Sequence, residues 1–210
     1  MGDDRSDREL LEAWRSGDNE SGNTLLVRHF AAVYRFFAGK VSTGVQDLVQ
    51  QTFLACVERG DGFRGEGSFR SYLLGIARHK FIDHLRSKHG LRNEIELESR
   101  SLAGLLGSPS QVAANRQEQR VLLAALRRLP LDLQVALELH YWEEMSTAEI
   151  AEVLDVPRGT VKTRLHRARE QLRQVIAEVA GSDALAAATL ANLEQWARSL
   201  RELLVDPSQP

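Results

Sequence analysis

The sequence predicts an all-α protein made of two small helical domains, and three observations carry this prediction. Apolar residues recur at helical spacing over most of the chain, first between Leu10 and Leu85 and again over residues 116–178. Only five prolines interrupt the chain, and no run of alternating β-branched residues is long enough for a strand. Residues 91–115, in contrast, hold glycine, serine and proline with little periodicity, which predicts a flexible linker between the domains.

The first domain is expected at residues 25–90, and a short N-terminal segment leads into it. Residues 1–24 carry seven acidic and three basic side chains, which predicts an acidic segment with one helix. Inside the domain, apolar side chains recur at helical spacing over residues 25–37, 48–56 and 69–88. A glycine-rich break at residues 60–68 precedes the last stretch, and Ser68 is a residue type that often caps a helix N-terminus.

The second domain is expected at residues 116–178 and contains the strongest local signal, a helix-turn-helix. Ser146 and Glu149 form a capping-box pattern that opens a short helix. Ala151 is small enough to let a second helix cross closely, and a tight turn follows. Asp155 in that turn is expected in the left-handed backbone conformation, and Pro157 suits the first turn of the next helix.

The second helix of this motif has the composition that a major-groove helix needs. Val161, Leu165 and Ala168 form its buried side. Arginine can pair bidentately with guanine, and the other basic side chains can hold phosphates. The alternative is a solvated amphipathic helix, but the cap, turn and small residue in this order favour DNA binding. The candidate DNA-binding side chains are Arg158, Thr160, Lys162, Thr163, Arg164, His166, Arg167 and Arg169.

A C-terminal helical extension is expected at residues 182–205. Leu193, Trp196, Leu200 and Leu203 repeat at 3-4-3 spacing and give it an apolar stripe. We favour a helix that packs back on the second domain. The alternative is a regulatory helix that shields the DNA-binding face or recruits a partner.

The placement of charge is more informative than the net charge of −2. Residues 25–90 carry ten basic and five acidic side chains, and residues 156–175 carry six basic against one acidic. These two basic patches indicate a nucleic-acid partner. Because the chain lacks a phosphate-cradling GxxxxGK[ST] motif and a spaced metal-ligand cluster, we predict no catalytic residue, metal site or cofactor.

The sequence also bears on the compartment in which the protein works. No apolar run approaches the length of roughly 18 residues that a membrane span needs, so no membrane insertion is expected. The N-terminus lacks the basic-then-apolar order of a signal peptide. The single cysteine, Cys56, lies on an apolar helix face and is expected to be a buried thiol. These features predict a cytoplasmic protein.

Three motifs in the first domain and one before the helix-turn-helix carry a family resemblance. They are DLVQQTFL at residues 47–54, FRGEGSFRSYL at 63–73, IARHKFIDHLR at 76–86 and LRRLP at 126–130. In order and spacing they resemble conserved regions 2 and 4 of the sigma-70 family, in its extracytoplasmic-function (ECF) group. The resemblance covers roughly residues 10–175.

The resemblance implies roles for particular residues. The helical face of Asp47, Gln50, Gln51 and Leu54 would dock on the β′ clamp helices of core RNA polymerase, and region 4 would contact the β flap. The loop at residues 63–68 and the helix that follows it would capture the melted −10 element, with a base flipped out against an aromatic ring. Phe63, Phe69 and Tyr72 are candidates for this ring, although Phe69 and Tyr72 are expected in the core. The candidate −10 residues are Phe63, Arg64, Gly65, Ser68, Arg70, Arg78, His79, Lys80, Arg86 and Lys88.

We therefore predict an RNA polymerase sigma factor that recognises the −35 and −10 elements of promoter DNA. An anti-sigma factor is a further partner implied by the resemblance. One alternative is an autonomous helix-turn-helix regulator whose first domain dimerises or binds a ligand, which would bind duplex DNA tightly without polymerase. Another is a helical adaptor that does not bind DNA, in which neutralising Arg164 and Arg167 would change nothing.

Overall fold

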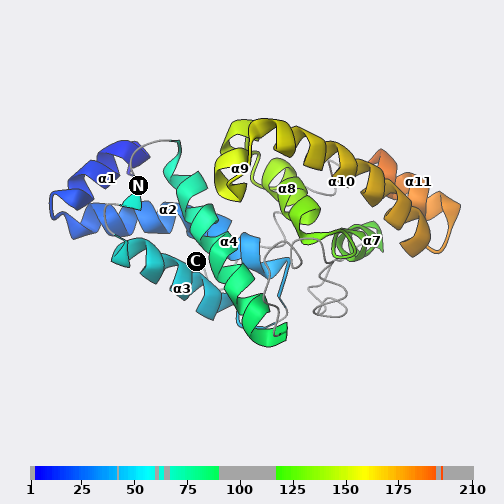
Figure 1. The fold of residues 1–210 in the computed structure, drawn as a ribbon, viewed down its shortest axis with the longest axis horizontal. Coiled ribbons are helices and arrows are strands. Elements are labelled where there is room, and N and C mark those ends of the chain that lie inside the picture. Colours follow the sequence, from blue (N-terminus) through cyan, green and yellow to red (C-terminus); the bar gives the residue numbers. More distant parts are fainter. Residues whose placement is uncertain are drawn as a thin grey trace.

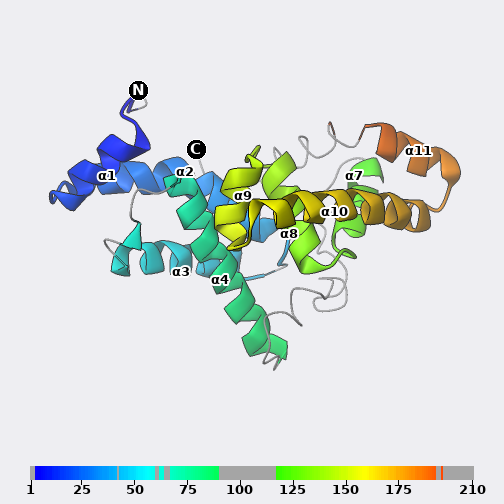
Figure 2. The ribbon, with the colours of Figure 1, turned by 45° about the horizontal axis from the view of Figure 1, so that its top comes forward.

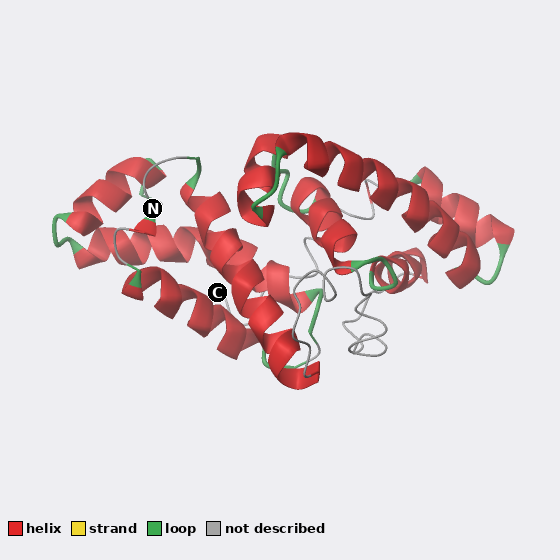
Figure 3. Ribbon diagram, in the orientation of Figure 1, coloured by secondary structure: helices red, strands yellow, loops and turns green. Residues whose placement is uncertain are grey.

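The computed structural model describes residues 3–41, 43–59, 62–63, 67–89, 117–192 and 195, and helices are the regular elements among them (Figures 1 and 3). The all-α prediction is confirmed. The first group of helices is α1 (Asp7–Arg15), α2 (Asn19–Ala38), α3 (Val45–Glu58) and α4 (Phe69–His89). The second group is α7 (Gln117–Leu126), α8 (Leu131–Tyr141), α9 (Thr147–Leu154), α10 (Arg158–Val179) and α11 (Asp183–Ala191).

The first group packs around large apolar side chains of α2 and α4. Phe81 of α4 lies edge-on to Phe36 at 6.3 Å and close to Phe37 at 6.4 Å between ring centroids. Such edge contacts stabilise a core beyond the area they bury. Helix α4 starts where Ser68 caps it, because the Ser68 hydroxyl accepts a hydrogen bond of 3.0 Å from the backbone N–H of Ser71. The predicted N-cap is therefore confirmed.

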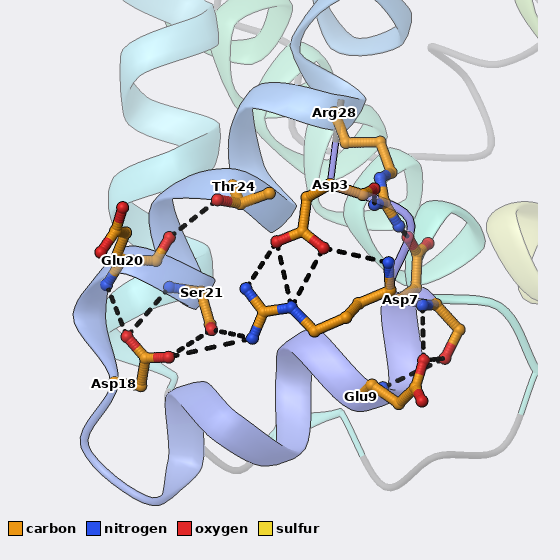
Figure 4. Close-up of polar contacts among 10 residues, drawn as sticks. Asp3, Asp7, Glu9, Asp18, Glu20, Ser21, Thr24 and Arg28 are labelled. Atoms are coloured by element: carbon orange, nitrogen blue, oxygen red, sulfur yellow. Dashed lines mark hydrogen bonds and ion pairs between the residues drawn. The ribbon is translucent and has the colours of Figure 1, made fainter. Parts of the chain in front are cut away.

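Polar contacts tie the acidic N-terminal segment to α2 (Figure 4). Arg5 donates to the Asp3 carboxylate at 3.0 Å and to the Ser21 hydroxyl at 2.8 Å. Arg28 of α2 donates to the Asp7 carboxylate at 2.8 Å. The aspartates are thus paired with arginines of the same region, and the acidic segment is a structural part of the first group.

The second group is organised around α10, which packs against α7, α8, α9 and α11. Val161, Leu165, Ala168, Leu172 and Ile176 form its buried stripe, so the predicted buried side is confirmed. Helix α11 packs on α7 and α10 and buries Ala186 and Thr189. For this part of the extension, the expected packing on the second domain is confirmed. The apolar stripe at Leu193, Trp196, Leu200 and Leu203 and the linker at 91–115 lie outside the described residues.

The two groups are in direct contact, since α9 of the second group lies against α4 of the first (Figures 1 and 2). The buried apolar side chains of both groups form one continuous cluster. At the crossing, a Cβ built on Gly75 would lie 3.9 Å from the carbonyl oxygen of Val153, so the helix backbones approach closely. Within the described part of the chain, no helix is long and apolar enough to span a membrane.

Candidate promoter and polymerase interfaces

The helix-turn-helix has the local geometry that its sequence predicts. The Ser146 hydroxyl accepts from the backbone N–H of Glu149 at 3.3 Å, and the Glu149 carboxylate accepts from the backbone N–H of Ser146 at 2.8 Å. Asp155 has φ 52° and ψ 50°, so its left-handed conformation is confirmed. Pro157 is the N-cap of α10, one position before the first turn in which it was expected. The turn thereby presents the N-terminus of α10 at the surface.

Five of the eight candidate side chains on α10 point to solvent: Arg158, Lys162, Thr163, His166 and Arg167. Arg158 also donates to the Thr147 hydroxyl at 2.9 Å. Thr160 is only half-buried at the start of the helix. The solvent-facing set places three positive charges along the first half of α10, spread around its exposed side, which suits a groove of phosphates.

Two arginines expected on the exposed face are held by α8. Arg164 lies 3.2 Å from the Asp132 carboxylate, and its side chain is 16 % exposed. Arg169 donates to the Tyr141 hydroxyl at 2.9 Å, and its guanidinium lies 5.7 Å from the centre of that ring. Full exposure of these two side chains is therefore not observed. Their bonds fix the angle between α8 and α10.

The loop before α4 is anchored from both sides. The guanidinium of Arg15 in α1 donates to the carbonyl oxygen of Phe63. The Phe63 ring is buried between Phe69 at 5.8 Å and Tyr72 at 5.4 Å. Phe69 is buried as expected, and Tyr72 is half-buried. Arg64 and Gly65 lie outside the described residues. No local sequence pattern indicated this role of Arg15, because its partner is a backbone atom 48 residues away.

The basic side chains of α4 divide into outward and inward ones. His79 and Lys88 are exposed, while Lys80 and Arg86 are half-buried. Arg86 lies 3.4 Å from the Asp83 carboxylate. Arg78 is buried, so the expectation that it is exposed was wrong. It follows Leu74 by four residues and precedes Phe81 by three, and both of these are fully buried on the same helix side.

Arg70 faces the second group, where it pairs with Glu143 between α8 and α9. Arg35 of α2 donates to the same carboxylate through two nitrogens, at 2.7 and 2.9 Å. Burial alone would raise the pKa of Glu143, but the hydrogen bonds and charges of Arg35 and Arg70 outweigh it and lower the pKa. The Glu143 carboxylate is therefore ionised at neutral pH and compensates two guanidinium groups.

A second buried ion pair joins the groups at the C-terminal end of α2. Lys40 is 0 % exposed, and its amine donates to the Glu138 carboxylate of α8 and to the carbonyl oxygen of Phe36 at 2.7 Å. Burial lowers the pKa of the Lys40 amine, and the charge of Glu138 counters part of that shift. Glu138 also accepts from the Gln134 amide at 2.7 Å, so both of its oxygens are used.

Two cavities flank the loop before α4. One, of about 480 Å³, lies between α1 and the start of α4, with Arg8, Arg15 and Phe69 in its lining. The other, of about 310 Å³, is lined by α4 residues including Tyr72 and His79 and by Glu152 of α9. The buried Tyr72 hydroxyl has no hydrogen-bond partner among the described residues. The side of α4 that carries His79 therefore borders a hollow whose lining includes an acidic side chain.

A third surface lies on α3, where all four predicted polymerase-contact residues are exposed: Asp47, Gln50, Gln51 and Leu54. Leu54 is 54 % exposed, and Val57, one turn later, is 48 % exposed. Val57 was missed, although its spacing from Leu54 places it on the same side of the helix. Beside them, the rings of Phe30 and Phe53 stack at 6.0 Å across α2 and α3. Exposed apolar side chains next to polar ones are typical of a protein-binding surface.

Cys56 of the same helix faces inward, as predicted. Burial raises the pKa of its thiol to about 11. The described residues hold no group of three or more His, Cys, Asp or Glu side chains that could bind a metal ion.

Comparison with known families matches both groups of helices. Residues 25–90 match the model of sigma-70 region 2, and residues 119–172 match that of sigma-70 region 4. The ECF RNA polymerase sigma-E factor of Escherichia coli (strain K12) is 30 % identical over 182 residues, which cover 82 % of this chain and 95 % of the relative. The chain belongs to the sigma-70 family, in its ECF group.

Other relatives of this sigma factor agree. The ECF RNA polymerase sigma-E factor of Haemophilus influenzae is 30 % identical over 84 % of the chain and 98 % of the relative. Among solved structures, CnrH in complex with the cytosolic domain of CnrY has a TM-score of 0.57 at 27 % identity, covering 82 % of this chain and 97 % of that one. The sigma factor RpoE of Bartonella quintana, solved with the anti-sigma factor NepR, has a TM-score of 0.57 at 20 % identity and covers 75 % of this chain and 98 % of that one. This likeness shows the fold alone.

The sigma factor thus has the two conserved regions that its sequence predicted. It is an RNA polymerase subunit for promoter-specific initiation, and the autonomous regulator is not favoured.

Proposed function

We propose that this sigma factor divides promoter recognition between its two helical groups. Residues 116–178 read the −35 element as duplex, and residues 25–90 hold the melted −10 element and the core polymerase. The observation that carries the proposal is the capped helix-turn-helix whose second helix presents Arg158, Lys162 and Arg167 to solvent. The chain itself catalyses no reaction, because phosphodiester synthesis belongs to the core enzyme. It works in the cytoplasm.

In the −35 complex, α10 enters the major groove with its N-terminal end. Arg158, Lys162 and Arg167 contact bases and phosphates. The shorter side chains of Thr160, Thr163 and His166 add further polar contacts. Arg164 and Arg169 contribute through their bonds to α8, which hold α10 at its angle. Their positive charge still adds to the attraction of the phosphate backbone.

The −10 complex uses the loop before α4 and the outward side of that helix. Phe63, Arg64, Gly65 and Ser68 border the flipped base, and the tilted contact of the Phe63 ring with Tyr72 supports a rigid wall for that pocket. The phosphates of the single strand lie along α4, where Arg70, Lys80, Arg86 and Lys88 supply positive charge and His79 supplies an exposed polar side chain, whereas Arg78 is buried and makes no contact with the strand.

The α3 surface docks on the β′ clamp helices of the polymerase through Asp47, Gln50, Gln51 and Leu54, and region 4 contacts the β flap. The exposed apolar side chains of Leu54 and Val57 supply area that such docking would bury. An anti-sigma factor is a further partner, which the solved complexes of CnrH with CnrY and of RpoE with NepR support.

Run-off transcription with purified core polymerase and a promoter library tests this function. Transcripts that appear only when the protein is added, and that share a −35 and a −10 sequence, are the expected result. Leu54→Asp should abolish co-elution with core, whereas Arg167→Ala should leave co-elution intact and weaken transcription. Neither transcripts nor co-elution from the unaltered protein would refute the proposal.

A further inference from the structure

The C-terminal end of α1 reaches the loop before α4. Arg15 is the last residue of α1, and its guanidinium donates a hydrogen bond to the carbonyl oxygen of Phe63. The Phe63 ring lies 5.8 Å from that of Phe69 and 5.4 Å from that of Tyr72, between ring centroids. Phe63 is therefore held through its main chain by α1 and through its side chain by α4. Helix α1 precedes residues 25–90, the part of the chain that matches sigma-70 region 2.

Helix α1 is itself fixed on α2 near both of its ends (Figure 1). Near its start, the Asp7 carboxylate lies 2.6 Å from Nε2 of His29 in α2. Near its end, Trp14 packs so closely on Gly22 that a Cβ built there would lie 2.6 Å from the indole ring. Groups that extend from packed helices are held more precisely than groups on loops. Arg15 therefore extends from a firmly held position.

A cavity separates part of the loop from α1. Its volume is about 480 Å³, and its lining includes Arg15, Phe63, Gly67 and Ser68. Gly67 has φ 77°, in the left-handed region that glycine enters without strain. Glycine also gives a loop more conformations to choose from when nothing holds the chain. The hydrogen bond from Arg15 restricts the main chain beside this cavity, where empty space replaces packed side chains.

A guanidinium is well suited to holding a main chain in place. It carries its charge at every pH at which the protein is folded, and a hydrogen bond from a charged donor is roughly twice as strong as one between neutral groups. Because the acceptor is the Phe63 carbonyl oxygen, the bond fixes the path of the main chain itself. In the proposed −10 complex, Phe63 and Ser68 border the flipped base. A change in the main chain at Phe63 would therefore move a wall of that pocket.

We propose that Arg15 is a positioning residue for −10 recognition, which holds the Phe63 carbonyl and thereby keeps the loop in the conformation that accepts the flipped base, without binding DNA itself. This inference rests on the proposed −10 role of the loop. Affinity falls in proportion to the fraction of chains whose loop is in the competent conformation. Loss of a hydrogen bond from a charged group changes such an equilibrium on the order of tenfold. Arg15 thus acts on recognition of the flipped base and not on the general attraction of phosphates.

The test compares Arg15→Ala with Arg8→Ala in the sigma factor bound to core polymerase. Arg8 is the matched control, because it lies on the same helix, lines the same cavity and has a side chain that is 87 % exposed. Fluorescence anisotropy measures the affinity for two single-stranded DNAs, one with the −10 sequence selected by run-off transcription and one with that sequence scrambled. Arg15→Ala should lower the ratio of the two affinities about tenfold, and Arg8→Ala should leave it unchanged.

A conservative variant and the salt dependence separate positioning from direct contact with DNA. Arg15→Lys should keep most of the affinity ratio, because an ammonium group also donates to a carbonyl oxygen. In Arg15→Ala, the affinity for the scrambled strand and the salt dependence of binding should stay as they are. If Arg15 bound a phosphate, both strands would be weakened alike, and the slope of log affinity against log salt would fall by about 0.7. That result would overturn the proposal.

Hydrogen exchange followed by NMR tests the loop in the free chain, without DNA or polymerase. The Gly62 amide donates to the Arg59 carbonyl at 2.9 Å, directly before Phe63. Arg15→Ala should speed exchange at Gly62 and leave the amides of α8 unchanged. Because the Arg15 side chain is exposed, this variant should fold, which circular dichroism checks.

The outcomes distinguish this inference from the proposed function. Unchanged exchange at Gly62 in folded Arg15→Ala would show that Arg15 does not hold the loop, whatever the transcription result. An unchanged affinity ratio would equally remove the positioning role, although the sigma function would stand. No transcripts from the unaltered protein would refute the proposed function and, with it, the −10 role of Arg15, even where exchange shows that Arg15 holds the loop.

Discussion

The two surfaces proposed to read promoter DNA differ in what their charges contact. On α10, Arg158, Lys162 and Arg167 point to solvent, and the arginines that do not are held within their own helical group. At the start of α4, Arg70 is paired with a carboxylate from the other group. A basic patch in a sequence therefore identifies a candidate DNA surface, but only the fold shows whether that surface is available.

The largest expected effect concerns whether the two regions are stabilised together. Phe81→Ala removes a ring that packs edge-on between Phe36 and Phe37, and should lower the free energy of unfolding by about 3–5 kcal/mol in urea denaturation. Because the apolar cluster is continuous, hydrogen exchange should also show weaker protection in α8. Unchanged protection in α8 would mean that the two groups unfold independently.

Smaller losses of DNA affinity should distinguish the two proposed DNA surfaces. Arg167→Ala should weaken binding to duplex DNA carrying the −35 element by about 1–3 kcal/mol and reduce the salt dependence. Lys80→Ala, on α4, should leave duplex binding by region 4 unchanged. Fluorescence anisotropy of the polymerase-bound protein at several salt concentrations measures both. Equal losses for the two variants would contradict the proposed division of labour.

Lowering the pH should weaken the contact between the two helical groups without displacing α10 within its own group. The pKa of Glu143 is lowered below 4.5, so its stabilising contribution is present above that ordinary value and is lost as the pH falls through the lower folded value. The radius of gyration should therefore increase as the solution is acidified below about pH 4.5. In Glu143→Gln it should already be enlarged at neutral pH and change less. A rise of the same size in both chains would assign the acid effect to other groups.

The smallest effect lies in the turn of the helix-turn-helix. Asp155→Gly removes a side chain from a left-handed residue and should stabilise the protein by about 1 kcal/mol or less. Asp155→Ala should destabilise it, because alanine tolerates this conformation less well than aspartate. Thermal unfolding followed by circular dichroism measures whether each variant is more or less stable than the unaltered protein. A loss of stability in the glycine variant would show that the Asp155 side chain has a favourable role.

Local signals predicted the elements well. The period of apolar residues placed α4 and α10, and the Ser146–Glu149 pattern placed the start of α9, because each depends on neighbours within a few residues. The α3 surface was predicted from helical spacing and family resemblance, and each of its four residues is exposed.

The errors and omissions concern contacts between distant residues. Arg78 was expected outside because basic residues usually are, although its helical position lies on the buried stripe. No local pattern indicated roles for Glu138 and Glu143, which are partners of residues 98 and 108 positions away. Pattern reading along one helix cannot specify which side of another helix it meets.

The burial of Cys56 has a practical consequence for optical experiments on domain motion. With a pKa of about 11, roughly one thiol in ten thousand is ionised at pH 7, and the sulfur is also shielded from solution. A cysteine introduced at the surface of each helical group would therefore react with maleimide dyes long before Cys56 does. Energy transfer between two such dyes could then follow the separation of the groups in real time, with the native cysteine left in place.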